Sequence, residues 1–243
     1  MDKKLALITG GTKGIGAGIS KMLLHHGYDI IVTYCNDVAN ADAFVVQARL
    51  DFPSSEITAI RIDNSDYSQV AKLVQYISEK KAIHCIVCNA GITLRKTLTE
   101  ISNDDWLRVM NANVNNNLFM IRDLYPFIPN DSRIVFIGSM MAVRPHGTSL
   151  AYGVSKSAVH ALALNLVKFF EGTGTTVNVI APGFVETDWQ KSKPEEIRQN
   201  IYRKTAIKRF ATVEEIADAV KFCVYNPFVN GSVIEVSGGY DFK

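Results

Sequence analysis

The sequence has no run of about 20 apolar residues, the length that a helix needs to span a bilayer. Its apolar opening, Leu5–Thr9, ends in a glycine turn after a few residues and is too short for a secretory signal peptide. Charge of one sign is scarce too: the formal net charge is +2, and the basic residues are dispersed. We therefore expect a cytoplasmic protein that binds neither a membrane nor nucleic acid.

Cysteine is also rare, with 4 among 243 residues. Cys85 and Cys88 form a C-x-x-C pair, but no second C-x-x-C or histidine pair completes a zinc site. The run Ile83–Cys88 predicts a buried strand, in which residues three apart face opposite sides. We therefore expect two core thiols and no bound metal.

No linker rich in proline, glycine or serine divides the chain, which instead alternates short apolar runs with helical patterns. The predicted strands are Lys4–Thr9, Asp29–Tyr34, Glu56–Ile62, Ile83–Cys88, Arg133–Gly138, Thr175–Ile180 and Ser232–Val236. The predicted helices are Gly14–His26, Val38–Asp51, Asp66–Glu79, Asn103–Tyr125, Ala151–Glu171 and Val213–Val224. This alternation indicates an α/β fold: a single domain over residues 1–243, built on a doubly wound parallel sheet (Rossmann fold) of about seven strands.

One segment, residues 182–208, interrupts the alternation. It begins with Pro182-Gly183 and contains a short helical stretch near Glu195–Tyr202. An insertion after the carboxyl end of a strand is well placed to form a lid over a substrate site. A simple packing insertion is the alternative.

A glycine-rich turn, Thr9-Gly10-Gly11-Thr12-Lys13-Gly14-Ile15-Gly16, follows the first strand and opens the first helix. Glycines allow a tight turn and a close backbone approach, and a helix N-terminus offers unpaired N–H groups to a phosphate. The turn therefore predicts a dinucleotide site. The spacing G-x-x-x-G-x-G fits the general dinucleotide fingerprint only loosely, and an ordinary tight turn is the alternative.

Tyr152 and Lys156 stand four residues apart, and Tyr152 comes thirteen residues after Ser139. Residues at this spacing share one face of a helix, so the ammonium group can lie beside the phenol. A nearby positive charge lowers the pKa of a tyrosine from its reference of roughly 10. The pair thus predicts an acid that works near neutral pH. An exposed helical pair without a chemical role is the alternative.

Taken together, these spaced motifs resemble the short-chain dehydrogenase/reductase family. The resemblance rests on Thr9-Gly10-x-x-x-Gly14-Ile15-Gly16, Cys88-Asn89-Ala90-Gly91, Ser139, Tyr152-x-x-x-Lys156 and Pro182-Gly183, and it runs from Leu5 to Gly239. The segments Ala181–Asp188 and Val236–Tyr240 resemble 3-oxoacyl-(acyl-carrier-protein) reductases in particular.

The resemblance implies roles for four residues. Tyr152 would protonate a carbonyl oxygen during reduction, and Ser139 would orient that carbonyl. Lys156 would lower the pKa of Tyr152 and hold the nicotinamide ribose. Asn113 would anchor a water molecule that relays protons to the lysine.

The charge at the end of the second strand favours NADP(H). That strand ends at Tyr34 and is followed by Cys35, so no carboxylate stands where NAD enzymes of this architecture bind the ribose 2′-OH. Lys13 supplies a cation where similar NADP-using enzymes often carry one. Asp37 is the contrary sign, but we expect it to begin the next helix as its N-cap.

The remaining cofactor contacts follow from the resemblance. Asp63 would bind the adenine amino group, Asn89 and Gly91 would line the adenine-ribose side, and Thr187 would bind the nicotinamide carboxamide. The full predicted cofactor set is Gly10, Gly11, Thr12, Lys13, Gly14, Ile15, Gly16, Tyr34, Cys35, Asp63, Asn89, Ala90, Gly91, Tyr152, Lys156, Pro182, Gly183, Val185 and Thr187.

The resemblance implies NADPH-dependent reduction of a ketone to a secondary alcohol. The expected substrate is a 3-oxoacyl thioester of the fatty-acid-synthesis type, with acyl-carrier protein as a candidate partner. Residues 126–132 contain no Lys or Arg that could face an acidic carrier, which leaves Arg144, Lys191 and Lys193 as candidates. The alternatives are an NADP(H)-dependent reductase or dehydrogenase of a sugar, steroid or other small alcohol, and a non-catalytic dinucleotide-binding sensor or scaffold.

We also expect a homotetramer. The resemblance implies packing through the helices Asn103–Tyr125 and Ala151–Glu171 and through the last strand. The second of these helices carries more apolar residues than one sheet-facing stripe requires, namely Val154, Ala158, Leu162, Leu166, Phe169 and Phe170.

Overall fold

The computed structural model describes residues 3–80, 82–144, 149–191 and 193–242. Within these residues seven strands form one parallel sheet in the order β3-β2-β1-β4-β5-β6-β7. The strands are β1 Leu5–Ile8, β2 Asp29–Tyr34, β3 Ile57–Arg61, β4 Cys85–Cys88, β5 Arg133–Ile137, β6 Thr176–Pro182 and β7 Val233–Val236. The predicted doubly wound sheet is confirmed. The strand order reverses between β1 and β4, which is where such sheets bind ligands.

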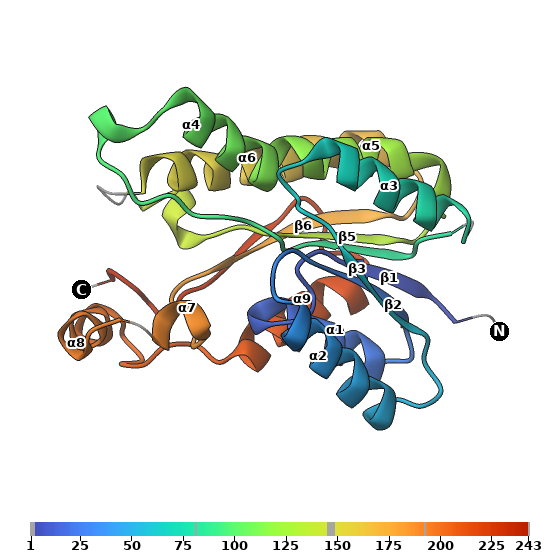
Figure 1. Ribbon diagram of the computed structural model, residues 1–243, viewed down its shortest axis with the longest axis horizontal. Coiled ribbons are helices and arrows are strands. Elements are labelled where there is room, and N and C mark those ends of the chain that lie inside the picture. The colour runs from blue at the N-terminus through green and yellow to red at the C-terminus, as the bar shows by residue number, and fades with distance from the viewer. Residues whose placement is uncertain (1–2, 81, 145–148, 192, 243) are drawn as a thin grey trace.

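Helices cover both faces of the sheet (Figure 1). One face carries α1 Gly14–His25, α2 Val38–Asp51 and α9 Val213–Tyr225; the other carries α3 Tyr67–Ser78, α4 Asn103–Met110, α5 Asn116–Leu124 and α6 Leu150–Leu166. Each face has its own apolar core, because successive strand residues point to opposite sides.

The C-x-x-C pair lies in β4, as predicted, with both thiols buried. Cys85 belongs to the core under α1 and α9, whereas Cys88 belongs to the core under α3, α5 and α6. Burial raises the pKa of the Cys85 thiol to about 12. No group of three His, Cys, Asp or Glu side chains in the described part of the chain could hold a metal ion.

The predicted helix Asn103–Tyr125 is wrong in one respect, because it is not continuous. A π-helical turn, Asn111–Asn115, separates α4 from α5, and the Asn116 N–H donates to the carbonyl oxygen of Asn111. A π-turn inserts one residue without breaking the apolar pattern on either side, so periodicity does not reveal it. Similarly, the predicted helix Ala151–Glu171 ends as α6 at Leu166 and continues as a 3₁₀ turn, Val167–Phe170.

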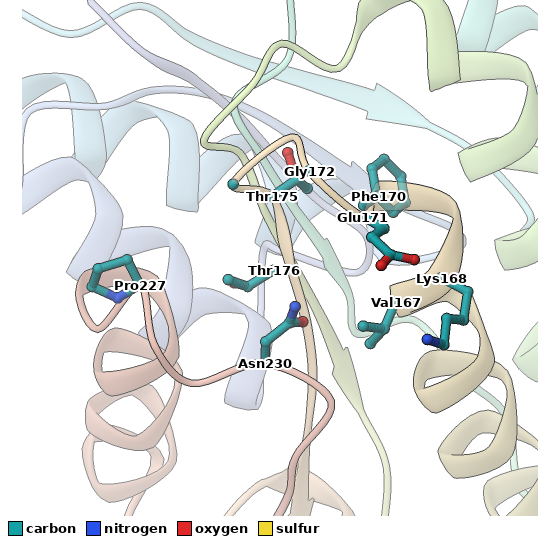
Figure 2. Close-up of a pocket in the computed structure, with 10 residues that line it drawn as sticks. Val167, Lys168, Phe170, Glu171, Gly172, Thr175, Thr176, Pro227 and Asn230 are labelled. Carbon is teal, nitrogen blue, oxygen red and sulfur yellow. The ribbon is translucent and has the colours of Figure 1, made fainter.

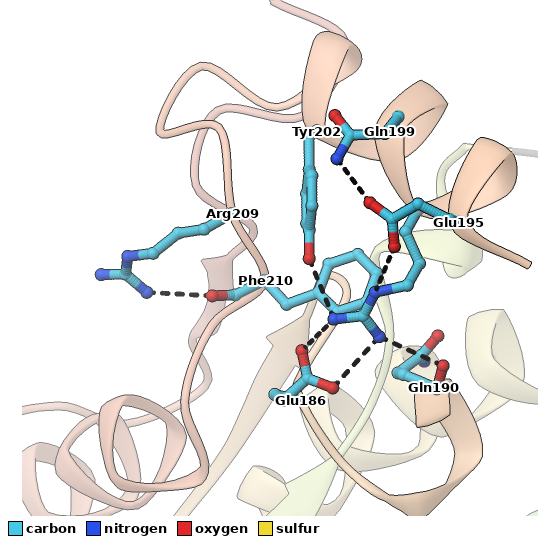
Figure 3. A network of polar contacts seen from close by, with 8 residues as sticks. Glu186, Gln190, Glu195, Gln199, Tyr202, Arg209 and Phe210 are labelled. Carbon is cyan, nitrogen blue, oxygen red and sulfur yellow. Dashed lines mark hydrogen bonds and ion pairs between the residues drawn. The ribbon is translucent and has the colours of Figure 1, made fainter. Parts of the chain in front are cut away.

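The segment 182–208 forms α7 Asp188–Lys191 and α8 Glu195–Lys204 beyond the two helical layers (Figure 1). Residue 192, within the predicted lid, lies outside the described residues. Arg198 in α8 binds both carboxylate oxygens of Glu186, at 2.6 and 3.2 Å. It also donates to the Tyr202 hydroxyl at 2.9 Å and lies 4.7 Å from the Phe210 ring centroid (Figure 3). Arg198 therefore ties α8 to the chain on both sides of it, and opening of the segment as a lid stays a prediction.

None of the helices in the described residues has the length and apolar character to cross a membrane.

Candidate active site

The predicted site residues converge at the carboxyl edge of the sheet. The glycine turn follows β1, Asn89–Gly91 follows β4, Ser139 follows β5, and Pro182 ends β6. Because these strands are parallel neighbours around the point where the strand order reverses, their carboxyl ends present the segments to one crevice.

The glycine turn is shaped for close backbone approach. Gly14 has φ +52°, in the left-handed region that favours glycine. A Cβ on Gly16 would lie 2.1 Å from the Gly10 carbonyl oxygen, so only glycine fits there. Lys13, the N-cap of α1, makes no side-chain capping hydrogen bond. The N-terminus of α1 therefore suits a phosphate group, whose oxygens would accept from its N–H groups.

Asn89 links β4 to the glycine turn. Its Nδ2 donates to the carbonyl oxygens of Thr9 and Gly10, at 2.9 and 3.1 Å. The Thr9 hydroxyl oxygen in turn accepts from the N–H groups of Asn89 and Ala90, at 3.0 and 2.9 Å. The Asn89 amide thus holds the two strand ends together, and its contact with a cofactor stays a prediction.

Asp37 is the N-cap of α2, as predicted: its side chain accepts from the Asn40 N–H at 3.2 Å. It also forms an ion pair with Lys13, in which Nζ and Oδ2 are 3.5 Å apart. Both side chains are about half exposed, at 54% and 46%. Asp37 therefore neutralises part of the Lys13 charge, in addition to the capping role that the sequence predicts for it.

Arg61, which no sequence motif marks, stands beside Tyr34 in the register of β2 and β3. Its Nε donates to the carbonyl oxygen of Cys35 at 3.0 Å. Arg61 and Lys13 are thus two cations near the residue after Tyr34, and their charges act on the Cys35 thiol. The register that places Arg61 beside Tyr34 cannot be read from either predicted strand. Asp63 lies two residues after Arg61, and its Oδ1 accepts from the N–H and the hydroxyl of Ser65. Its contact with an adenine stays a prediction.

Ser139 and Tyr152 lie together, as the motif predicts, and their side chains share a hydrogen bond. The Ser139 Oγ also accepts from the Met141 N–H at 3.1 Å, capping a 3₁₀ turn, Met140–Ala142. Ser139 is only 7% exposed. Two hydroxyl groups are thus available to one carbonyl oxygen at the end of β5.

The expected lowering of the Tyr152 pKa is wrong for this structure. Burial raises the pKa of Tyr152, and the hydrogen bond with Ser139 offsets this only in part. Lys156 Nζ lies 5.7 Å from the Tyr152 ring centroid and donates to the Ile137 carbonyl oxygen at 2.6 Å. Desolvation of the phenolate therefore outweighs any favourable effect of the neighbouring ammonium group.

Lys156 is buried at 5% exposure, and burial lowers its pKa to about 8. A Cβ on Gly91 would lie 3.6 Å from Lys156 Nζ and 3.1 Å from Asn113 Oδ1. The loop after β4 therefore meets both residues. The lysine is a charged group whose proton is held weakly enough to be exchanged near neutral pH.

The Asn113 side chain is fully engaged with protein groups. Its Oδ1 accepts from the Ile92 N–H at 2.8 Å, and its Nδ2 donates to the Ile92 carbonyl oxygen and to Ser155 Oγ, at 3.0 and 2.8 Å. Anchoring of a relay water by Asn113 thus stays a prediction.

His160, one helical turn after Lys156, is a second residue that the sequence analysis missed. Its Nε2 accepts from the Ser139 N–H at 3.4 Å, and it is 9% exposed. Burial and the Lys156 charge lower its pKa, which keeps Nε2 an acceptor. The repeat of four residues through Tyr152, Lys156 and His160 was the signal that could have found it.

The segment after β6 closes the crevice from the other side. A Cβ on Gly14 would lie 3.4 Å from Thr187 Cγ2, so Thr187 faces the glycine turn, and its contact with the nicotinamide carboxamide stays a prediction. The Gly183 N–H donates to the Val236 carbonyl oxygen at 2.9 Å, and Val185 is 4% exposed, packed in the core. A contact between Val185 and a cofactor would thus involve its backbone.

The family model described as "Enoyl-(Acyl carrier protein) reductase" matches residues 10–241 of the chain. The chain is 30% identical over 242 residues to 3-oxoacyl-[acyl-carrier-protein] reductase FabG of Chlamydia muridarum, covering 97% of this chain and 96% of the relative. It is 28% identical over 250 residues to acetoacetyl-CoA reductase of Synechocystis sp., covering 99% and 97%. The solved structure of a blue fluorescent protein from a metagenomic library, in complex with NADPH, aligns with a TM-score of 0.90 at 32% identity and covers 97% of each chain.

The chain belongs to the short-chain dehydrogenase/reductase family. It is thus an oxidoreductase, and the resemblance noted in the sequence is confirmed. A short chain dehydrogenase from Burkholderia cenocepacia has been solved in complex with NADP, and the blue fluorescent protein in complex with NADPH. The site here suits such a cofactor: the α1 N-terminus and the close approach at Gly16 fit a pyrophosphate, and Lys13 and Arg61 fit a 2′-phosphate.

A separate pocket lies at the opposite, amino edge of the sheet of this short-chain dehydrogenase/reductase (Figure 2). Val167 and Phe170 line one side of it, Thr175 the base of β6, and Pro227 and Asn230 the other side. The predicted site residues all lie elsewhere, at the carboxyl edge. The pocket therefore contributes nothing to the chemistry of the crevice.

Proposed function

We propose that the protein uses NADPH to reduce a ketone to a secondary alcohol, and that the ketone is a 3-oxoacyl thioester. The observation that carries the proposal is the hydrogen-bonded pair Ser139–Tyr152 beside buried Lys156, at the edge of the sheet where the glycine turn lies. When bound, NADPH supplies the hydride. The side chains of the protein supply orientation and the proton.

The two hydroxyl groups suit a carbonyl oxygen that becomes negative during reduction. Ser139 donates a hydrogen bond to that oxygen, and Tyr152 donates a hydrogen bond and then its proton. Because burial raises the pKa of Tyr152, the residue stays protonated at neutral pH and is present as the acid. Lys156, with a pKa of about 8, is the nearby group able to return a proton to the tyrosine.

The preference for NADPH over NADH rests on charge. Lys13 and Arg61 stand near Cys35, and the carboxylate closest in sequence, Asp37, already caps α2 and pairs with Lys13. Asp63 also acts on Cys35, but the end of β2 itself carries no carboxylate to accept a 2′-OH, and a 2′-phosphate would meet Lys13 and Arg61 there.

The choice of a thioester rests on the relatives named above and on two cations that border the crevice. Of the candidates from the sequence, Lys191 pairs with Asp188 and Arg144 pairs with Glu235, each at 2.7 Å. Lys193 has no ion-pair partner among the described residues, and the positive charge of Arg95, in the loop after β4, adds to burial in lowering its pKa. Two positive charges that act on each other suit a phosphate-bearing arm, such as that of coenzyme A or a carrier protein.

A substrate panel tests the proposal. NADPH oxidation would be followed with acetoacetyl-CoA, acetoacetyl-acyl-carrier protein, a crotonyl thioester, sugars and steroid ketones. We expect turnover with the acetoacetyl thioesters and little with the others. Faster turnover of the crotonyl thioester would assign an enoyl reductase instead. Binding of NADPH without turnover of any compound would favour the non-catalytic sensor or scaffold.

We further propose that the enzyme works as a homotetramer in the cytoplasm. Four apolar side chains on α6 and the turn after it are exposed: Leu150, Val154, Leu164 and Phe169. Leu166 and Phe170, which the sequence analysis counted with them, are buried in the core of their own chain. The last strand, β7, lies at one edge of the sheet, and Phe228, which precedes it, is 96% exposed. Unpaired edges and apolar helix faces are typical of subunit contacts.

A further inference from the structure

The π-helical turn Asn111–Asn115 is surrounded by buried asparagine side chains. Asn64, after β3, donates from Nδ2 to the Ala112 carbonyl oxygen at 2.5 Å. Asn117, in α5, donates from Nδ2 to the Asn113 carbonyl oxygen at 2.8 Å and to that of Ala112 at 3.5 Å. Asn64 is 8% exposed, and Asn117 is 2% exposed.

These contacts are directed at the turn itself. The Asn64 amide points its NH₂ group to the turn and to Asn117 Oδ1, while its own Oδ1 is buried without a hydrogen-bond partner in the described structure. An unpaired buried oxygen is unfavourable, so the donor bond to Ala112 must outweigh that loss. The Asn64 backbone is held as well, because its carbonyl oxygen accepts from Asn116 Nδ2 at 2.8 Å.

The π-helical turn also positions α6, the helix that carries Tyr152 and Lys156. Asn113 Nδ2 donates to Ser155 Oγ at 2.8 Å, and Ser155 immediately precedes Lys156. Both polar groups of the Asn113 amide also bind the backbone of Ile92, next to the Gly91 that meets Lys156 Nζ. A shift of the turn would therefore move the loop and the helix that enclose the lysine.

We propose that Asn64 and Asn117 are positioning residues, which hold the π-helical turn so that Asn113 and its contacts place Lys156 for proton transfer. The inference rests on the proposed function, since it assumes that Lys156 serves ketone reduction. It adds two buried residues whose amide groups donate to the turn itself. The donor groups of both amides are directed at carbonyl oxygens of the turn, and such directed bonds in a core favour one arrangement of the backbone, which is the property that such a role needs.

The test compares Asn117→Leu, which is close in volume but lacks the donor, with the control Asn115→Leu. Asn115 belongs to the same turn, but its amide donates only to Asn111 Oδ1. We expect Asn117→Leu to lower kcat roughly 10- to 100-fold, as small misplacements of catalytic groups do, with KM for NADPH within about threefold. The control should stay within about twofold of the wild type in both constants.

The double variant Asn64→Val/Asn117→Leu separates positioning from stability. It replaces both amides by apolar side chains but leaves the Ala112 and Asn113 carbonyl oxygens without these donors, so thermal melting measures the loss of stability separately from kcat, which should stay low. A stable double variant with wild-type kcat would overturn the proposal.

A second readout does not need turnover. The titration of Lys156 can be followed by NMR in lysine-labelled protein and assigned with Lys156→Met. We expect Asn117→Leu, but not Asn115→Leu, to move the midpoint from about 8 toward the ordinary value of 10.5. If the wild type reduces no ketone, the proposed function fails, but the titration still tests whether Asn117 positions Lys156. An unchanged midpoint would overturn it.

Discussion

The side chain of Tyr152 is hydrogen-bonded to that of Ser139, although the two lie in separate units of the fold, one in the first turn of α6 and the other after β5. Burial raises the pKa of Tyr152, and this bond acts in the opposite direction. The tyrosine is thus kept protonated and aimed by one neighbour. Tyr152 is therefore fully protonated before the reaction and gives up its proton only when negative charge develops on the substrate oxygen.

Replacing Tyr152 by phenylalanine should therefore remove the acid while leaving the fold intact. We expect kcat for an acetoacetyl thioester to fall by roughly 10²–10⁴-fold, because a general acid contributes that much. NADPH binding, measured by fluorescence titration, should stay nearly unchanged. Tyr225→Phe, a half-exposed tyrosine in α9, serves as the control. Near-normal kcat in Tyr152→Phe would end the assignment.

Lys13 and Arg61, the two cations near Cys35, should bind the 2′-phosphate of NADPH. We expect Lys13→Ala and Arg61→Ala each to raise the Kd for NADPH about tenfold, toward the lower end of charge-assisted contacts because both side chains are exposed. The Kd for NADH should change little, since NADH has no phosphate for the charges to meet. Equal losses for both cofactors would show that neither residue reads the phosphate.

Asp37→Asn offers a matched variant for the same site. Asparagine caps a helix as well as aspartate does, so α2 should remain intact. The substitution removes the carboxylate that pairs with Lys13. We therefore expect NADPH to bind more tightly and NADH to be unaffected, which isothermal titration would show.

Most of the fold follows from the alternation of apolar runs and helical patterns, and the site motifs follow from local spacing. Tyr152 and Lys156 share a helical face because they are four positions apart, which the sequence gives directly. Arg61 and the pKa of Tyr152 could not be found this way, because one depends on strand register and the other on burial by the whole fold. The π-helical turn at Asn111–Asn115 leaves the apolar periodicity on either side unchanged, so only the backbone reveals it.

Burial of Lys156 should be visible in the pH dependence of stability. Its pKa in the folded protein, about 8, lies below the ordinary 10.5 that it has in the unfolded chain. Between these values the unfolded chain binds more protons, so the free energy of unfolding rises with pH, by up to about 1.4 kcal/mol per pH unit.

Urea unfolding of the wild type and of Lys156→Met at pH 7.5, 9 and 10 would measure this effect. The difference between the two proteins cancels the other alkaline groups. We expect the wild type to gain stability relative to the variant as the pH rises through this window. A flat or falling difference would mean that Lys156 is not a buried, protonated group at neutral pH.

Lys193 and Arg95, for which the described residues contain no ion-pair partner, should matter only for substrates that carry phosphate. We expect Lys193→Ala and Arg95→Ala to raise KM for acetoacetyl-CoA several-fold to about tenfold, since each removes a charge-assisted contact. KM for the acetoacetyl thioester of N-acetylcysteamine, which lacks phosphate, should not change. Lys191→Ala is the control, because that lysine already pairs with Asp188. Parallel losses with both thioesters would place the cations outside the recognition of the carrier arm.

Assembly should steady the helix that holds Tyr152 and Lys156. We expect static light scattering at micromolar concentration to give a mass near four times the 26.9 kDa chain. Phe169→Glu should lower that mass and the activity together, because it introduces a charge on the exposed face next to α6, where Phe169 is 67% exposed. Leu50→Glu, on α2 and 71% exposed, should leave both unchanged. A stable, fully active monomer would contradict the tetramer, because the catalytic helix would then need no partner to keep its shape.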